Sequence, residues 1–259
     1  DELGKTAARV LGKYDGHDLE YDPGWERPQG MKLPILVGYS DGVVPKAECI
    51  DLAEHHLFVG GVDSGGTIDI LRSVADTIIS RKDTHLCIAD SLLKFSHIED
   101  KAVVATEPAT MLDMLKGLRR VMAERLDGKK DIFHKDNIVL IIEEIGEIII
   151  RGSSEETDSP ETYKMRVDLA ECHAIVKEFL ITGRQAGLYV IVASQHSPAL
   201  MPGLLNEFGA RIALRSTEAV SIAIVGDNSA AKQAAGYAVL RVGDRSVAVR
   251  IPAFCVEQG

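Results

Sequence analysis

With 259 residues, of which 46% are hydrophobic and 26% charged, the chain has the composition of a folded soluble protein and the length of one large α/β domain. Its net charge of −10 excludes a surface that attracts nucleic acid along its whole length, because phosphate binding needs clustered Lys and Arg. The four cysteines form no C-x-x-C pair, so we expect neither a metal site nor disulfides, and no apolar run approaches the roughly 18 residues of a membrane span.

The chain opens with a helical pattern and a connector. Residues 3–11 place apolar side chains on one face at helical spacing, which predicts a short helix that packs against the main body or a preceding domain. The connector that follows is polar, nonperiodic and rich in Gly and Pro. We therefore divide the chain into an N-terminal helix and linker at 1–30 and one main domain at 31–259. Because the first residue is Asp1 rather than Met, we expect a piece of a longer protein.

Short apolar runs then alternate with helical patterns. Each run is continuous and too short for a helix, as in strands buried on both faces of a parallel sheet. The predicted strands are 56–60, 85–90, 102–106, 137–144 and 188–194. The alternation predicts an α/β fold with helices on both faces of the sheet.

The connections complete this prediction. Helices are expected at 68–80 and 109–126, and another helix contains Leu169 and Ile175. The acidic, turn-rich segment 152–161 predicts a surface loop. Near the end of the chain, apolar and polar residues alternate around the Gly243-Asp244 pair, which predicts a β-hairpin.

The segment HLFVGGVDSGGTID, residues 56–69, leads from a buried strand into a glycine-rich turn and then a helix. This is the setting of a phosphate-binding loop, G-x-x-x-x-G-K-[ST], in which backbone N–H groups hold the phosphates, Lys reaches the β and γ groups, and the hydroxyl binds Mg²⁺. The candidate nucleotide-binding residues are Gly61, Val62, Asp63, Ser64, Gly65, Gly66, Thr67 and Ile68.

Two registers of this loop are compatible with the sequence. Read from Gly61, the loop has Thr67 in the lysine position and Ile68 in the hydroxyl position. Read from Gly60, it has Gly66 in the lysine position and Thr67 as the Mg²⁺ ligand. Both registers lack the cation.

The loop also carries an acid. Asp63 would repel a polyphosphate rather than attract it, so the anion site is compromised a second time. A glycine turn without any ligand is the alternative, and the loop alone leaves both interpretations open.

Two acids end the strand IVLII. In nucleoside triphosphatases this pattern places a metal-binding Asp and a catalytic Glu at the carboxyl end of a strand; here Glu143 replaces the Asp, and Glu144 keeps the residue type that polarises a water. Gln195 ends the strand LYVIVAS and is a candidate sensor of the γ-phosphate. The alternatives are acids that face solvent and an ordinary polar strand end.

The order of six blocks resembles that of the FtsK/SpoIIIE-like ATPases: HLFVGGVDSGGTI, LCIAD, VMAERL, IVLIIEE, TGRQAGLYVIVASQ and GARIALRS. The resemblance covers roughly residues 33–250. It implies a P-loop NTPase (RecA-like) three-layer fold with a mainly parallel sheet and a C-terminal β-hairpin. ATP and Mg²⁺ are the implied ligands, weakly bound because of the altered loop.

The superfamily comprises DNA translocases and the EccC/EssC motor proteins of type VII secretion, which carry several such domains in tandem, the later ones often degenerate. Three features favour the second group: the loop without lysine, the start at Asp1, and the ending AAGYAVLRVGDRSVAVRI, which is similar to the region that closes secretion-type domains. The D-S-R-T-I-L block of translocases is replaced by the uncharged residues 219–225.

Two arginines match recurrent positions of the family. Arg125 in VMAERL stands where an arginine finger can reach a neighbouring subunit's nucleotide, and Arg184 in TGRQAG matches another recurrent arginine. A solvated helix residue and a loop salt bridge are the respective alternatives.

The resemblance thus implies a degenerate ATPase-fold module of a type VII secretion motor, which acts in substrate recognition or regulation with weak or no ATP hydrolysis. Its implied partners are adjacent ATPase domains of the same chain, secreted protein substrates and, in the full-length motor, a homo-hexamer. Nucleic acid is not expected, and contact with the cytoplasmic side of the cell membrane would come only through other parts of the parent chain. The alternatives are an ATP-driven double-stranded DNA translocase and a pure binding module for a helical export signal.

Overall fold

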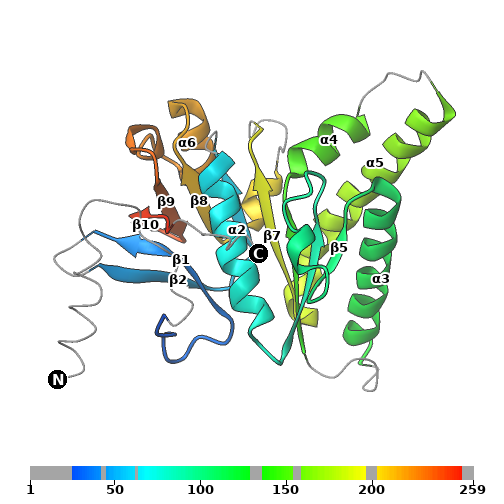
Figure 1. Cartoon of the computed structure of the whole chain (residues 1–259), viewed down its shortest axis with the longest axis horizontal. Helices are drawn as coiled ribbons and strands as arrows, with labels where there is room; N and C mark the ends of the chain where they lie inside the picture. Colours follow the sequence, from blue (N-terminus) through cyan, green and yellow to red (C-terminus); the bar gives the residue numbers. More distant parts are fainter. Residues whose placement is uncertain are drawn as a thin grey trace.

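A mixed sheet of ten strands forms the centre of the computed structural model (Figure 1). The structure describes residues 25–41, 45–61, 64–128, 136–153, 159–196 and 203–252. The helix predicted over residues 3–11 lies outside the described residues. Within the described part of the chain, no helix has the length and apolarity that a membrane crossing requires.

The sheet has a parallel part and an antiparallel part. The strand order is β2-β1-β10-β9-β8-β3-β7-β6-β4-β5, and the strands from β8 to β5 run parallel. The other strands extend the sheet in antiparallel fashion, with β9 and β10 forming the predicted hairpin. The strands are β1 Pro34–Ser40, β2 Lys46–Asp51, β3 Leu57–Gly60, β4 Thr84–Ala89, β5 Val103–Ala105, β6 Asn137–Ile142, β7 Leu188–Ser194, β8 Ala210–Leu214, β9 Tyr237–Val242 and β10 Arg245–Arg250.

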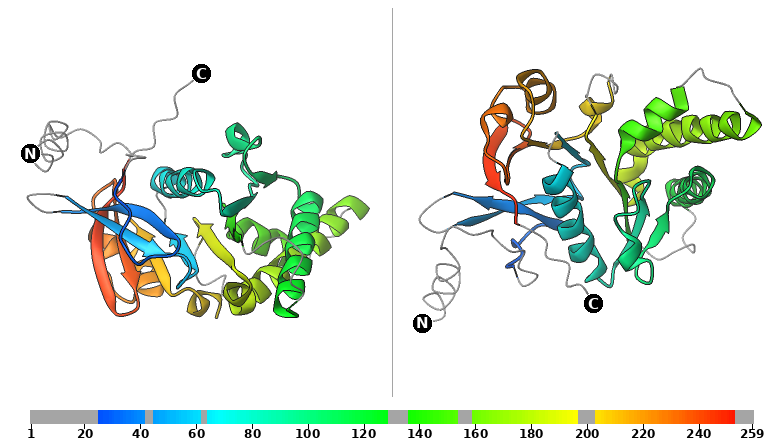
Figure 2. Two further views of the ribbon diagram at one scale, coloured as in Figure 1. Left: turned by 90° about the horizontal axis from the view of Figure 1, so that it is seen from below. Right: turned by 45° about the horizontal axis from the view of Figure 1, so that its top comes forward.

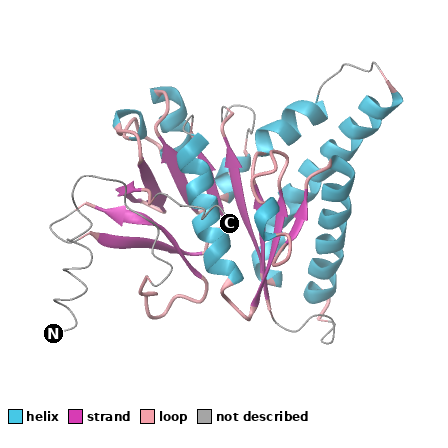
Figure 3. Cartoon of the chain, viewed as in Figure 1, coloured by secondary structure: helices cyan, strands magenta, loops and turns pink. Residues whose placement is uncertain are grey.

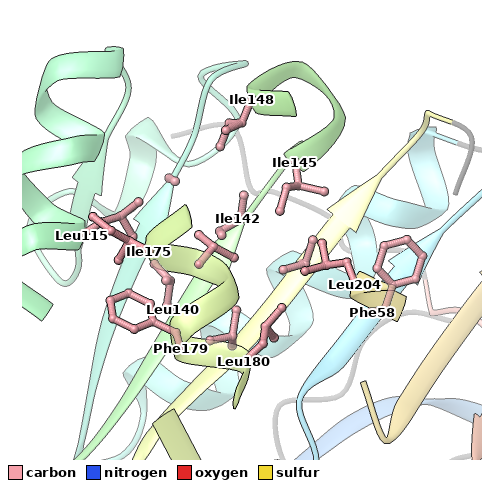
Figure 4. Close-up of a cluster of buried hydrophobic side chains, with 14 of the residues drawn as sticks. Phe58, Leu115, Leu140, Ile142, Ile145, Ile148, Ile175, Phe179, Leu180 and Leu204 are labelled. Carbon is pink, nitrogen blue, oxygen red and sulfur yellow. The ribbon is translucent and has the colours of Figure 1, made fainter. Parts of the chain in front are cut away.

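Helices cover both faces of the sheet and complete three layers (Figure 3). The helices are α2 Ser64–Ile79, α3 Pro108–Leu126, α4 Ile145–Ser153, α5 Pro160–Thr182 and α6 Glu218–Val225. One core cluster packs α2 against side chains of β1, β3, β6 and β7, and a second packs α3, α4, α5 and α6 against the opposite face. Figure 4 shows this second cluster, with Phe179 and Leu180 of α5 beside Leu140 of β6.

Local signals fix where the helices begin. Ser159 caps α5 by accepting the N–H of Thr162 at 3.1 Å, and a proline takes the first helical position. Thr217 caps α6 in the same way, and Gly226, with φ of 90°, ends it in the left-handed conformation. These residues therefore fix the first turns of α5 and α6, and Figure 2 shows the chain from two further sides.

The predicted α/β fold is confirmed, and every predicted strand is present in the parallel part. The sequence pattern predicts no strands over residues 34–51 and no helix between β6 and the acidic loop, where the structure has β1, β2 and α4. The edge strand β2 escapes prediction because it alternates polar and apolar residues and is buried on one side only. The predicted loop 152–161 is shorter than expected, because α4 ends at Ser153 and α5 begins at Pro160.

A buried histidine at the start of the central strand makes the fold sensitive to acid. His56 is 1% exposed, and its Nδ1 accepts the N–H of Val190 at 3.0 Å. Burial lowers the pKa of His56 to about 4, and Arg184 contributes by repulsion. The folded chain therefore holds His56 neutral at pH values where the unfolded chain would charge it.

We expect this histidine to cost the protein about 3 kcal/mol of unfolding free energy as pH falls from 6.5 to 4, because a folded pKa near 4 lies below the ordinary value of 6.5. The stabilisation is complete above pH 6.5 and is lost below it. His56→Asn keeps an acceptor for Val190 and removes the titration. Urea unfolding of both proteins from pH 4 to 8 should show the wild type losing its advantage over His56→Asn on acidification, and a constant difference would contradict this assignment.

Candidate functional site

The glycine turn lies at the carboxyl edge of the sheet, between β3 and α2. Because β3 ends at Gly60 and α2 begins at Ser64, only residues 61–63 connect them. Gly61 has φ of 142°, and a Cβ there would lie 2.9 Å from Cβ of Leu214 and 3.0 Å from its carbonyl oxygen. Glycine is therefore required both for the backbone conformation and for the close approach to β8. The candidates Val62 and Asp63 lie outside the described residues.

The first turn of α2 holds the other loop candidates. Ser64 and Gly65 open the helix, and Gly66 and Thr67 are buried within its first turns. Ile68 packs against the core cluster under α2, so in the register that begins at Gly61 a core side chain fills the hydroxyl position. No lysine or arginine occurs in the sequence from residue 57 to residue 71.

Three buried acids follow neighbouring strands at the same edge. Asp90 comes after β4, and Glu143 and Glu144 come after β6; their exposed fractions are 0%, 4% and 3%. Asp90 is satisfied, since its carboxylate accepts the N–H groups of Lys94 at 2.9 Å and Phe95 at 2.7 Å. Over the described ranges, no three His, Cys, Asp or Glu side chains are arranged to hold a metal ion.

Glu143 is the least satisfied member of this set. Its backbone N–H donates to the Ala89 carbonyl at 3.0 Å, but its buried Oε2 has no hydrogen-bond partner among the described residues. Burial raises the pKa of Glu143 to about 7, with repulsion from Asp90 and Glu144 adding to the shift and Lys94 opposing it. At neutral pH this carboxyl group therefore carries a proton for much of the time.

Glu144, in contrast, is fully engaged. Its Oε1 accepts the Gly146 N–H at 2.9 Å and the Ser194 hydroxyl at 2.8 Å, and its Oε2 accepts the Gln195 N–H at 2.8 Å. These bonds join the ends of β6 and β7 across the edge of the sheet. The predicted water-polarising carboxylate thus has a structural task in this conformation.

The bonds around Glu144 extend to a histidine. The backbone N–H of His196 donates to Oγ of Ser194 at 3.1 Å, and its Nε2 lies 3.1 Å from Oε1 of Glu147. The imidazole packs directly on the backbone of α4, because a Cβ at Gly146 would collide with its Cδ2. Gln195, the predicted sensor, has an exposed side chain, and its described contact is the backbone bond to Glu144.

Arg125 lies at the opposite edge of the sheet. Its Nη1 donates to the Ala186 carbonyl at 2.7 Å and its Nη2 to the Asp136 carbonyl at 2.9 Å. Both acceptors precede the strands β7 and β6, whereas the glycine turn and the acids follow strand ends. The chain therefore does not bring Arg125 to its own glycine turn, and a role at a neighbouring subunit's nucleotide stays a prediction. Arg184 also lies at this edge, where its Nη1 donates to the Glu54 carbonyl at 2.6 Å.

Arg125→Ala is expected to lower the free energy of unfolding by about 2 kcal/mol, because two partly buried charge-assisted hydrogen bonds that tie α3 to the sheet are lost. Arg120→Ala, an exposed position on the same helix, is the matched control and should change stability by less than about 0.5 kcal/mol. Denaturant unfolding measures both. Equal losses in the two variants would argue against a structural role for Arg125.

Sequence reasoning missed three parts of this site: Asp90, Ser194 and the Glu147–His196 pair. Asp90 and Ser194 carried a signal, because each stands at the end of a predicted parallel strand, and the carboxyl ends of parallel strands meet at one edge. The Glu147–His196 pair carried none, since it depends on α4, whose direction the sequence pattern did not reveal.

No family model and no curated protein sequence matches the chain. Solved structures do match its fold. The pCW3 conjugation coupling protein TcpA, solved as a monomer with ATPγS, has a TM-score of 0.76 and 18% identity over 92% of this chain and 70% of its own. The cytoplasmic domain of the Thermomonospora curvata type VII secretion ATPase EccC has a TM-score of 0.67 and 16% identity over 98% of this chain and 32% of its own.

A second EccC structure from the same organism, ATPases 2 and 3 in complex with a signal sequence peptide, has a TM-score of 0.67 and 13% identity over 92% of this chain and 44% of its own. The chain thus spans less than half the length of these EccC structures. These likenesses confirm the predicted α/β fold, which the chain shares with these ATPase structures.

Proposed function

We propose that this chain, folded as an FtsK/SpoIIIE-type ATPase domain, is a degenerate module of an EssC/EccC-type motor of type VII secretion that hydrolyses ATP weakly or not at all. The observation that carries the proposal is the glycine turn: it leads from β3 into α2 without a lysine, and Ile68 is partly buried against the core cluster under α2. The sequence of this turn offers backbone N–H groups and an acid, Asp63, but no lysine or arginine.

The free energy lost with the missing lysine contact is large enough to impair both nucleotide binding and hydrolysis. A charge-assisted bond from Lys to the β and γ phosphates contributes several kcal/mol across binding and the transition state, and no substitute follows in the sequence before Arg72. The Nη2 of Arg72 already donates to the Lys94 carbonyl at 3.3 Å. The residues present therefore suit a loosely held nucleotide, with Mg²⁺ brought by the nucleotide rather than by a preformed set of ligands.

The engagement of Glu144 supports the same proposal. A general base must reach the attacking water, and three hydrogen bonds within the protein hold this carboxylate at the strand ends instead. Hydrolysis would first require these bonds to break.

In this proposal the module recognises exported protein or regulates an active neighbour in the same parent chain, at the cytoplasmic side of the cell membrane and within a hexameric motor. One of the similar EccC structures is a complex with a signal sequence peptide, which supports a substrate-binding role for a domain of this fold. The net charge of −10 argues against nucleic acid as the substrate.

Isothermal titration of the chain with Mg-ATP tests the nucleotide part of the proposal. We expect no binding, or a Kd near the millimolar range that corresponds to about −4 kcal/mol. The variant Thr67→Lys restores the lysine of the Gly61 register and serves as the comparison. Micromolar binding by the unmodified chain would contradict the proposal.

An ATP-driven double-stranded DNA translocase is the second candidate, and the specific observation in its favour is the likeness to the conjugation coupling protein TcpA. A translocase should hydrolyse ATP faster when DNA is added. We expect no such stimulation, and a several-fold increase in phosphate release with linear duplex DNA would favour this candidate over the secretion module.

A further inference from the structure

A groove of about 500 Å³ opens beside the candidate site, between the start of α3, the helix α4 and the first half of α5. Its floor is apolar, formed by Met111, Ile148, Met165 and Leu169. Three of these side chains are buried and belong to the core cluster of this face, and Met165 is partly buried against it. The floor therefore offers an apolar surface to an apolar side chain.

The rim of the groove is charged and mainly acidic. The carboxylates are Glu107, Glu147, Glu161 and Asp168, while Arg151 and Lys164 are the cations. Apolar contact in the middle with an excess of negative charge around it suits a segment that carries a Lys or Arg beside apolar side chains. A carboxylate ligand or a phosphate would be repelled by the same rim.

One residue on the rim of the groove is connected to the hydrogen bonds that hold Glu144. Glu147 lines the groove and pairs with His196 at 3.1 Å. The N–H of the residue before His196, Gln195, donates to Glu144 at 2.8 Å, and the imidazole packs against Gly146. A cation that enters the groove and draws Glu147 away from the imidazole would thus disturb the segment that holds the buried carboxylate.

We propose that this groove is the docking site for a basic, partly apolar polypeptide segment of an exported protein, and that docking is communicated to Glu144 through Glu147 and His196. The inference rests on the proposed function for the identity of the partner. The chemistry of the partner, one or more cations flanking an apolar side chain, follows from the groove itself.

The probe is a fluorescein-labelled peptide about 15 residues long, the length at which an isolated helix becomes marginally stable, with leucines at helical spacing and lysines beside them. A matched peptide carries Glu in place of every Lys. Fluorescence anisotropy with the full chain should give a micromolar Kd for the lysine peptide and binding at least about tenfold weaker for the glutamate peptide.

The groove is tested with the double variant Glu161→Lys, Asp168→Lys, both on α5. The matched control, Glu54→Lys with Glu178→Lys, makes the same change in net charge at exposed positions that do not line the groove. We expect the first pair to weaken the lysine peptide by about tenfold and the control pair by less than about twofold. Equal effects, or equal binding of both peptides, would overturn the proposal.

The link to Glu144 has its own readout. Adding the lysine peptide should shift the backbone amide resonance of Gln195 in the full chain, and the shift should vanish in Glu147→Gln; an unmoved amide at saturation would refute the link. Sedimentation velocity tests whether a second copy of the chain occupies the groove instead. Self-association that is abolished by the double variant Glu161→Lys, Asp168→Lys would assign the groove to a second copy and contradict the proposal. If the peptide binds but ATP is hydrolysed rapidly, the proposed function fails and the groove stands.

Discussion

Replacing Glu143 with Gln is expected to raise the free energy of unfolding by about 3 kcal/mol at pH 8, in buffer that contains EDTA and no nucleotide, because the folded pKa is about 7 against an ordinary 4.5. Above pH 7 the folded wild type must carry a buried charge whose Oε2 has no partner among the described residues. Glutamine has almost the same shape and carries no charge. Few single substitutions stabilise a protein by this amount, which makes the prediction sharp.

The pH dependence gives the sign of the effect. Between pH 4.5 and 7 the folded chain binds a proton at Glu143 that the unfolded chain does not, so this residue makes the wild type less stable as pH rises. His56 has the opposite effect between pH 4 and 6.5, because there the unfolded chain binds the proton. The two contributions nearly cancel in the wild type.

Glu143→Gln removes one of these contributions and exposes the other. Urea unfolding should show the advantage of Glu143→Gln over the wild type growing with pH, to about 3 kcal/mol at pH 8. At pH 4 the two proteins should be equally stable, since the wild-type carboxyl group is then protonated in both states. A variant that is less stable than the wild type at pH 8 would show that the Glu143 charge is stabilised by a contact outside the described residues.

Glu144→Ala is expected to have the reverse effect and to lower the free energy of unfolding by about 3 kcal/mol, because two buried donors and one partly buried donor lose their acceptor at once. The donors belong to Gly146, Ser194 and Gln195, so the substitution also removes the side-chain link between the ends of β6 and β7. The adjacent acids thus have opposite effects on stability.

Glu144→Gln provides the matched comparison. It keeps the volume and one oxygen acceptor but turns an amide N–H₂ toward a donor, so we expect roughly half the loss seen for alanine. Thermal or urea unfolding at pH 8 measures both variants. Equal stability of Glu144→Ala and the wild type would show that these hydrogen bonds contribute nothing to stability. That result would also contradict the argument that the hydrogen bonds keep Glu144 from acting as a general base.

The sequence predicts five of the six parallel strands because they appear as continuous apolar runs, such as IVLII before Glu143, but it does not predict β8. It does not predict β2, in which polar and apolar residues alternate at the edge of the sheet. Nor does it reveal α4, whose first turn is capped by Glu144 through the Gly146 N–H rather than by one of the usual Ser, Thr, Asp or Asn residues.

The candidate site was likewise predictable from the sequence only in part. Parallel strand ends must share an edge, so the glycine turn, the two acids and Gln195 could be expected near one another. The sequence could not show which of the two acids has hydrogen-bond partners, because the donors come from α4 and β7 and meet only in the folded chain. The position of Arg125 was equally hidden, since its pattern is compatible with a finger and with the two backbone carbonyls that it binds.

Phosphate release by the full chain in saturating Mg-ATP tests the central claim most directly. The missing lysine and the engaged Glu144 predict a rate at the background of a protein-free sample, with no change in Glu144→Gln. Enzymes typically turn over on the order of 1 to 1,000 times per second. A sustained rate in that range, abolished by Glu144→Gln, would contradict the account.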